Sequence, residues 1–262
     1  IDTLAIGTGE EVKSVKLTAT TVNLGGDIVT SNTTGNNVDI NGATVLKGNT
    51  TINTSANNGT IDFSSTINSE GTETNNLTLK AKGGTIKING NIGTTREIGN
   101  LKINDGDASG TGVITLTGVG ADGTIGIVGT ADIGHTGTTG IDLAGSYYNI
   151  NGATTLTTAS TTKIIDIKAA LTIETADDAL SFVGGGIAMD NGADLTIDAG
   201  TGAVVLTVIN GVHDEVVDIS GGTIDTLAIG TGEEVKSVKL TATTVNLGGD
   251  IVTSNTTGNN VD

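Results

Sequence analysis

The chain has 262 residues with an unusual composition: 41 Gly, no Pro, no Cys, 2% aromatics and a formal net charge of −17. The lack of Cys excludes disulfides, thiolate metal sites and cysteine nucleophiles. The acidic balance argues against nucleic-acid binding, which needs a basic stripe. No apolar run approaches the roughly 18 residues that a membrane helix needs, so no membrane span is predicted.

The first element along the chain is a stretch that returns. Residues 1–39 and 224–262 are identical, so that Ile224 repeats Ile1 and Asp262 repeats Asp39. Self-similarity at a fixed period is the signature of repeat architectures. We therefore interpret 1–223 as one complete repeat unit and 224–262 as the start of the next identical unit, and the chain as a window onto a long tandem array. One unit carries 24 acidic and 10 basic residues, a net charge of −14.

Apolar–polar–apolar triplets recur between turn-forming residues, a pattern typical of short strands. Ten intervals between triplets fill one unit, and they are nearly equal except for the interval from Ile61 to Leu77, which is clearly shorter. The short interval indicates either a short coil near Ile67 or a wrong marker. The triplets are Val15–Leu17, Val38–Ile40, Ile61–Phe63, Leu77–Leu79, Leu101–Ile103, Ile125–Ile127, Tyr148–Ile150, Leu171–Ile173, Leu195–Ile197, Val217–Ile219 and Val238–Leu240.

This spacing predicts an all-β fold, a parallel β-helix (β-solenoid) with coils of about 22–24 residues and about ten coils per unit. The outer residues of each triplet would face inward and the middle one would face solvent. Gly and Asn would form the corners, and Pro would remove a donor from the ladder. A string of β-sandwich domains is the alternative, but such domains usually carry a Trp or Tyr core anchor, and this chain has no Trp.

Three segments resemble the repeats of giant bacterial surface proteins, namely the filamentous-haemagglutinin-like adhesins and related repeat-rich exoproteins. The resemblance is one of strand and turn style (LTI-x-AG, GGTI-x-I-x-G), runs through most of the unit and includes no catalytic motif. It implies a right-handed parallel β-helix, secretion, and service as a stalk, fibre or adhesive surface. The segments are Asn75–Thr95, Arg96–Gly106 and Gly192–Val208.

Histidine chemistry has two candidates, His135 and His213, the second in a His–Asp–Glu run. Such a run is able to bind metal or move protons. A metal ligand set also needs convergent partners, and the sequence shows none. We therefore interpret both histidines as exposed turn residues.

Catalysis by paired carboxylates is another possibility, because β-helices also carry polysaccharide lyases and hydrolases. A glycosidase needs a pair of carboxylates at a defined separation, and Asp166 with Asp190, or Asp194 with Asp198, are candidates across coils. The only Arg, Arg96, would pair with its neighbour Glu97. A solvated polar face is the favoured interpretation of all these residues.

Acidic turns leave Ca²⁺ open, because this ion takes six to eight oxygens, partly from turn carbonyls. Loosely held counter-ions are favoured, because the calcium-binding nonapeptide pattern is only approached at Gly184–Asp190. The acidic turns are Asn104–Asp107, Gly120–Gly123, Asp177–Asp178 and Asp214–Glu215.

An ice-binding face would need Thr residues aligned in one register. The pairs Thr20–Thr21, Thr154–Thr155 and Thr161–Thr162 do not keep one register through the triplets.

The favoured hypothesis is a structural component of an extracellular, cell-surface bacterial filament or adhesin stalk, with identical repeat units end to end, joined covalently or by stacking. No catalytic, cofactor-binding or metal-ligating residue is predicted. The first alternative is a carbohydrate- or cell-binding surface on the same solenoid, in which Tyr147 or Tyr148 would stack on a glycan. The second is a β-helix polysaccharide lyase or hydrolase.

Overall fold

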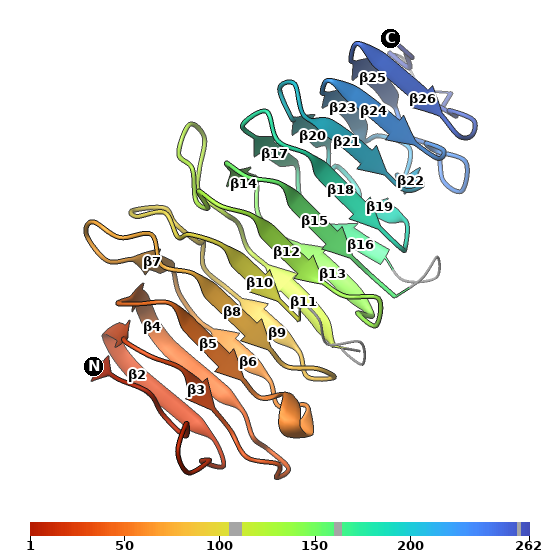
Figure 1. Cartoon of the computed structure of the whole chain (residues 1–262). Helices are drawn as coiled ribbons and strands as arrows, with labels where there is room; N and C mark the ends of the chain where they lie inside the picture. The colour runs from red at the N-terminus through yellow and green to blue at the C-terminus, as the bar shows by residue number, and fades with distance from the viewer. Residues whose placement is uncertain (105–111, 160–163, 256–257) are drawn as a thin grey trace.

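The structure is a computed structural model that describes residues 1–104, 112–159, 164–255 and 258–262. Within them the chain winds into an elongated parallel β-solenoid of about ten turns, with the two termini at opposite ends of the long axis (Figure 1). Every pairing between named strands is parallel. This confirms the predicted fold class and excludes β-sandwich domains, whose sheets are antiparallel.

Each turn contributes strand segments to three faces, numbered in the order in which the chain visits them. Face 1 begins with the N-terminal halves of two long strands that turn a corner, β2 (Val15–Leu24) and β4 (Val38–Leu46). It continues through β6 (Ile61–Phe63), β9 (Ile86–Ile88), β11 (Val113–Leu116), β13 (Gly140–Leu143), β16 (Ile164–Ile167), β19 (Ile187–Met189) and β22 (Ile209–Asn210).

Face 2 contains β1 (Asp2–Thr3), the C-terminal halves of β2 and β4, and β7 (Ile67–Ser69). Single bridges at Ile92 and Val119 continue it to a five-stranded sheet. The strands of that sheet are β14 (Tyr147–Ile150), β17 (Leu171–Thr175), β20 (Leu195–Asp198), β23 (Val216–Ser220) and β25 (Ser237–Thr241).

Face 3 is a ten-stranded sheet that runs the length of the molecule. One 3-10 turn, Ser55–Asn57, follows its second strand. The strands are β3 (Ile28–Val29), β5 (Thr50–Asn53), β8 (Leu77–Lys80), β10 (Leu101–Ile103), β12 (Ala131–Gly134), β15 (Thr154–Thr157), β18 (Leu180–Val183), β21 (Ala203–Leu206), β24 (Thr223–Thr226) and β26 (Thr244–Leu247).

The core is a set of apolar columns along the inside of the three faces. The triplets place alternate residues inward, as period-2 strands require, so that Ile stacks on Val or Ile of the turn below. The space between the faces is filled mainly by Ile, Leu and Val, and Phe63 and Phe182 are its largest fully buried side chains. On face 1 one column runs Val15, Val38, Ile61, Ile86, Ile114, Ile141, Ile165, Ile187, Ile209, Ile229 and Ile251.

Turn length varies more widely than the sequence predicted. Along the face-1 column the shortest step leads from Ile209 to Ile229 and the longest from Ile86 to Ile114. Extra residues leave the solenoid as loops. One such loop lies on face 2 between Val119 and Ile127, where Ala121 and Thr124 form an antiparallel bridge. Ile125 lies in that loop and is exposed, so its predicted inward position is wrong.

The triplets do not follow one face. The first three lie on face 1, but the interval from Ile61 to Leu77 passes from face 1 to face 3. The short interval therefore arises because the triplet at Leu77 lies on a different face from the triplet at Ile61. It is not a short coil. The interval from Leu101 to Ile127 then passes from face 3 to face 2, where the later triplets stay.

The second identical segment lies further along the same axis, but one face on. Val15 is on face 1, and nine steps of its column lead to Ile229. Val238, the copy of Val15, follows on face 2, where it pairs with Val217. The offset between the two copies therefore corresponds to nine turns and one face, and not to ten whole turns.

Corners are made by Gly and Asn, as predicted. Gly42 has φ 150°, and a Cβ there would lie 1.9 Å from the Ala19 carbonyl oxygen of the turn below. Between faces 2 and 3, Asn49 Oδ1 accepts from Asn76 N (2.8 Å), and Asn76 Oδ1 accepts from Asn100 N (2.7 Å). These amide oxygens satisfy backbone donors that the corner withdraws from the sheet ladder.

Candidate functional site at the junction of the identical segments

The junction is the set of places where residues 224–262 stack on the preceding turn. On face 3, β24 pairs with β21; on face 2, β25 pairs with β23; on face 1, Ile229 bridges to Ile209. Faces 2 and 3 cross residue 223 as strand ladders, and face 1 crosses it through a single bridge. The second segment thus continues the solenoid, and β26 stacks on β24 within the segment itself.

One side-chain hydrogen bond recurs in both identical segments. Asn23 Nδ2 donates to Asp2 Oδ1 at 2.6 Å, and Asn246 Nδ2 donates to Asp225 Oδ1 at 2.5 Å. The first pair lies on face 2 and the second on face 3. This contact within the segment therefore forms on either face of the solenoid.

Burial within the identical segments depends on the neighbouring turn. Ile1, which has no turn below it, is 50% exposed, whereas Ile224 is fully buried over β21. Leu24 is fully buried beneath the next turn, whereas Leu247 is 51% exposed. Because the sequences are the same, the difference in exposed fraction is due to the adjacent turn that covers the side chain in one copy only. Both ends of the chain therefore present apolar residues that a further turn would bury.

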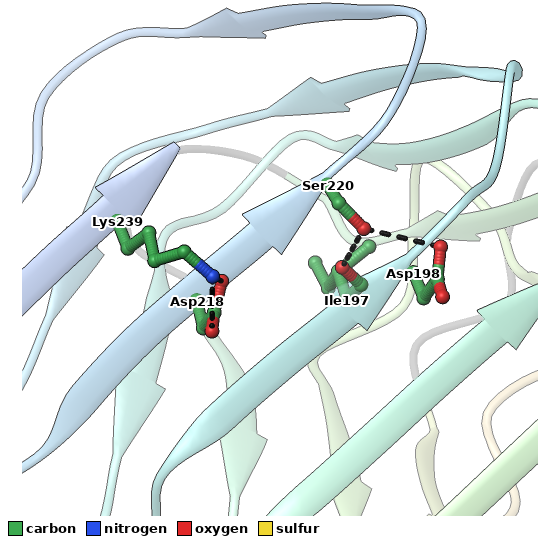
Figure 2. Close-up of polar contacts among 5 residues, drawn as sticks. All are labelled: Ile197, Asp198, Asp218, Ser220 and Lys239. Atoms are coloured by element: carbon green, nitrogen blue, oxygen red, sulfur yellow. Dashed lines mark hydrogen bonds and ion pairs between the residues drawn. The ribbon is translucent and has the colours of Figure 1, made fainter. Parts of the chain in front are cut away.

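An ion pair crosses the junction on face 2. Lys239 Nζ lies 3.2 Å from Asp218 Oδ2, and the two residues are direct partners in the β23–β25 ladder (Figure 2). Both are the outward-facing middle residues of their triplets. The pair joins a residue that precedes the second identical segment to a residue of that segment.

The preceding strand pair on face 2, β20 with β23, is connected by the hydroxyl group of Ser220. Ser220 Oγ lies 3.3 Å from the Ile197 carbonyl oxygen and 3.1 Å from Asp198 Oδ1, across the β20–β23 pairing (Figure 2). Side-chain contacts on face 2 thus connect β25 to β23 and β23 to β20.

Glu215 is a fully buried carboxylate just before the junction. Its Oε1 accepts from Gly192 N (2.9 Å) and its Oε2 from Val212 N (2.5 Å) and Asp214 N (3.2 Å). Burial alone would raise the pKa of Glu215, but the backbone N–H donors together hold that pKa below its usual value. The ionised side chain therefore fastens two turns together, as hydrogen-bonded carboxylates do.

The histidines lie apart, and His213 is exposed as predicted, whereas His135 is half-buried. His213 has φ 97°, and its Nδ1 is 3.4 Å from Glu234 Oε2 of the repeated segment. His135 sits in a turn where its Nδ1 contacts Thr136 Oγ1 at 3.0 Å. Among the described residues no group of three or more His, Cys, Asp or Glu is placed to hold a metal ion.

The first carboxylate pair is bridged by a cation. Lys168 Nζ contacts Asp166 Oδ2 and lies 3.6 Å from Asp190 Oδ2. Hydrogen bonding to Asp166 and the surrounding carboxylates raise the pKa of Lys168. Asp166 and Asp190 are therefore brought together, but as partners of one ammonium group, which does not leave a free pair for acid–base work.

The other charged pairs are not brought together. Asp194 directly precedes β20 and Asp198 ends it, about 13 Å away along the strand, and each accepts from a different group: Val216 N and Ser220 Oγ. That span exceeds the roughly 5–10 Å of glycosidase carboxylates. Arg96 is exposed, and the predicted ion pair with Glu97 is not formed, although the structure describes both residues.

The acidic turns are used structurally where they are described. Asp177 has φ 64°, and its Oδ1 accepts from Thr201 N at 2.8 Å. Gly120–Gly123 belongs to the exposed loop on face 2. The acidic part of Asn104–Asp107 lies outside the described residues, as does Thr161–Thr162.

Sequence reasoning missed one acidic pocket on face 2, whose lining includes Asn149, Glu174 and Asp198. Glu174 Oε2 accepts from Asn149 Nδ2 at 2.7 Å. Burial, together with the charges of Asp122 and Asp198, raises the pKa of Glu174 above its usual value. The charges meet because the loop carrying Asp122 lies on the same face, which the triplet spacing did not indicate.

The two tyrosines do not form an aromatic surface together. Tyr148 is buried in the face-2 column, and its hydroxyl donates to the Leu116 carbonyl oxygen at 2.5 Å. Tyr147 is half-buried and points the other way along the pleat. Glycan recognition through these rings therefore rests on Tyr147 alone and stays a prediction.

No helix in the described ranges is long and apolar enough to cross a membrane. No protein-family model, no curated protein and no solved structure matches the chain. The fold and its junction define the class of protein: a three-faced parallel β-solenoid in which the face-3 sheet runs from β3 to β26.

Proposed function

We propose that this chain is part of an extracellular structural filament or adhesin stalk, in which repeat units stack end to end in one continuous solenoid and carry no catalysis. The observation that supports this most directly is the pair Leu24 and Leu247. The same residue of the same segment is fully buried with a turn above it and 51% exposed without one. A further unit would restore the burial.

The physical argument is that a solenoid turn buries its apolar side only against its neighbours. An open end also leaves a row of unpaired strand edges that accept further strands. The junction at residue 223 offers no blocking feature, since all three faces pass through it. The net charge of −14 per unit would limit lateral aggregation, because like-charged surfaces repel.

The test is end-to-end association of the full chain. At rising concentration we expect sedimentation velocity to show larger species, and electron microscopy to show thin fibres with an axial repeat of about 4.8 Å. Leu247→Lys at the C-terminal end, or Ile1→Lys at the N-terminal end, should suppress growth. Val183→Lys is the matched control, because Val183 is similarly exposed but lies along the side of face 3.

A wild-type chain that stays monomeric at high concentration would overturn the proposal. Equal suppression by Val183→Lys and by the two end variants would also overturn it, because growth would then be lateral.

A further inference from the structure

The offset of nine turns and one face has a consequence for any array of these units. Residues 6 and 15 lie on faces 3 and 1, and their copies 229 and 238 lie on faces 1 and 2. The repeated segment advances by one face at both positions. We propose that successive units are each rotated by one face, about a third of a turn, so that the array returns to its starting face after three units.

This inference rests on the proposed function, since it requires units that follow one another along one axis. Its basis is the length of the unit. The segment keeps the same Asn-to-Asp hydrogen bond on either face, as the Asn23–Asp2 and Asn246–Asp225 pairs show. Its orientation is therefore set by the length of chain that precedes it, and each added unit of the same length adds the same fraction of a turn.

The contacts made at the junction favour the rotated position. On face 2 the copy of Lys16 is Lys239, which lies opposite Asp218 and forms an ion pair with it. In an unrotated junction Lys239 would lie on face 1, opposite Asn210. The Asn210 Oδ1 already accepts from Gly232 N at 2.9 Å. The rotated junction thus places opposite charges together, whereas an unrotated junction would place Lys239 over an amide.

The rotation determines how an array presents its surface. Leu4 and Leu227 are the same residue and both are exposed, at 81% and 53%. Leu4 lies at the corner between faces 2 and 3, after β1, and Leu227 at the corner between faces 3 and 1, after β24. Any group fixed to one side of a unit would therefore point in three directions along the array. Three units, or 28 turns, would span roughly 130 Å.

The rotation is tested first in this chain, which has no Cys of its own. Three double variants are compared: Asp218→Cys with Lys239→Cys, Asn210→Cys with Lys239→Cys, and Asp225→Cys with Asn246→Cys. Neighbouring strands lie about 4.8 Å apart, within the Cα separation that disulfides accept. The readout is the disulfide-linked peptide after mild oxidation and proteolysis.

The third pair is a positive control, because those residues face each other inside the segment wherever it lies. We expect the first pair to cross-link as fully as this control and the second to stay reduced. Cross-linking of the second pair in place of the first would overturn the rotation.

The array itself is tested with a chain of four tandem units that carries Leu227→Cys once in each unit, labelled with gold clusters. Cryo-electron microscopy should show a straight rod whose labels turn by a third of a circle per unit. A rod with all labels along one side would overturn the rotation and leave the proposed filament standing. Separate globular beads would overturn the filament, and with it the array.

Discussion

Lys16 and Lys239 are the same residue of the same segment, yet they lie on different faces. Lys16 is opposite Asp39 on face 1, whereas Lys239 forms an ion pair with Asp218 on face 2. An identical sequence thus has two sets of neighbours within one chain. Differences between the two copies therefore report the surroundings alone, which makes them matched controls.

The first prediction uses the leucines of the two copies. Leu24→Ala should destabilise the first turns by about 2–5 kcal/mol, because it removes a buried side chain and leaves a cavity. Leu247→Ala should cost much less, because Leu247 is half exposed. Native-state hydrogen exchange, read at the amides of β2 and β26, measures both changes. Equal loss of protection in the two variants would contradict the burial difference.

The second prediction concerns the close approach of two turns at a corner. A Cβ on Gly145 would lie 1.4 Å from the Thr117 carbonyl oxygen, whereas a Cβ on Gly48 would have nothing within 4 Å. Gly145→Ala should therefore displace the backbone and lower the free energy of unfolding by at least the roughly 1–3 kcal/mol of overpacking. Gly48→Ala should be close to neutral. Urea unfolding of both variants is the measurement.

An equally mild effect of the two alanines would mean that the Gly145 corner is wider than the structure has it.

The sequence predicted the fold class because the alternation of apolar and polar residues is a local signal. Val217-Asp-Ile219 and Val238-Lys-Leu240 have the predicted inward and outward positions, and their middle residues form the junction ion pair. The pairing of Asp218 with Lys239 could have been found from the spacing of these two triplets, which is close to one turn.

The face of each triplet could not be found in the same way. All three faces are lined by Ile, Leu and Val, so nothing in the triplet Leu77-Thr-Leu79 distinguishes face 3 from face 1. Loops add to the ambiguity, since Ile125 imitates an inward residue while it lies in an exposed loop. The number of turns per unit could therefore be counted only from the three-dimensional path of the chain.

The third prediction is that Glu174→Gln stabilises the fold at neutral pH. The amide keeps an oxygen that accepts from Asn149, and it removes a charge that burial, Asp122 and Asp198 all disfavour. The gain should be about 0.5 kcal/mol, typical of partly exposed charges. Glu73→Gln, at an exposed turn position, is the control.

The pH dependence of this variant follows from the raised pKa of Glu174. The folded state holds this proton more tightly than the unfolded state, so the cost of Glu174 is present at neutral pH. That cost disappears as the pH falls through the folded pKa toward the unfolded value of about 4.3. Thermal melting should show wild type and Glu174→Gln converging at acidic pH. A constant difference from pH 7 to pH 4 would contradict the assignment.

The fourth prediction has the opposite sign and concerns Glu215. In Glu215→Gln one oxygen is replaced by an NH₂ group that faces backbone N–H donors of Gly192 or Val212. A buried donor left without its acceptor costs about 1–3 kcal/mol. The variant should therefore unfold more easily at neutral pH, whereas Glu73→Gln should not.

The lowered pKa of Glu215 determines where this difference disappears. The ionised carboxylate contributes stability that is fully present above the unfolded pKa of about 4.3 and is lost as the pH falls through the still lower folded pKa. Wild type should thus lose stability in acid, and the gap to Glu215→Gln should narrow only below pH about 4. Because Lys236 N of the repeated segment donates to the Glu215 carbonyl oxygen at 2.8 Å, hydrogen exchange at Lys236 should rise in the variant. Unchanged exchange there would mean that Glu215 does not support the junction.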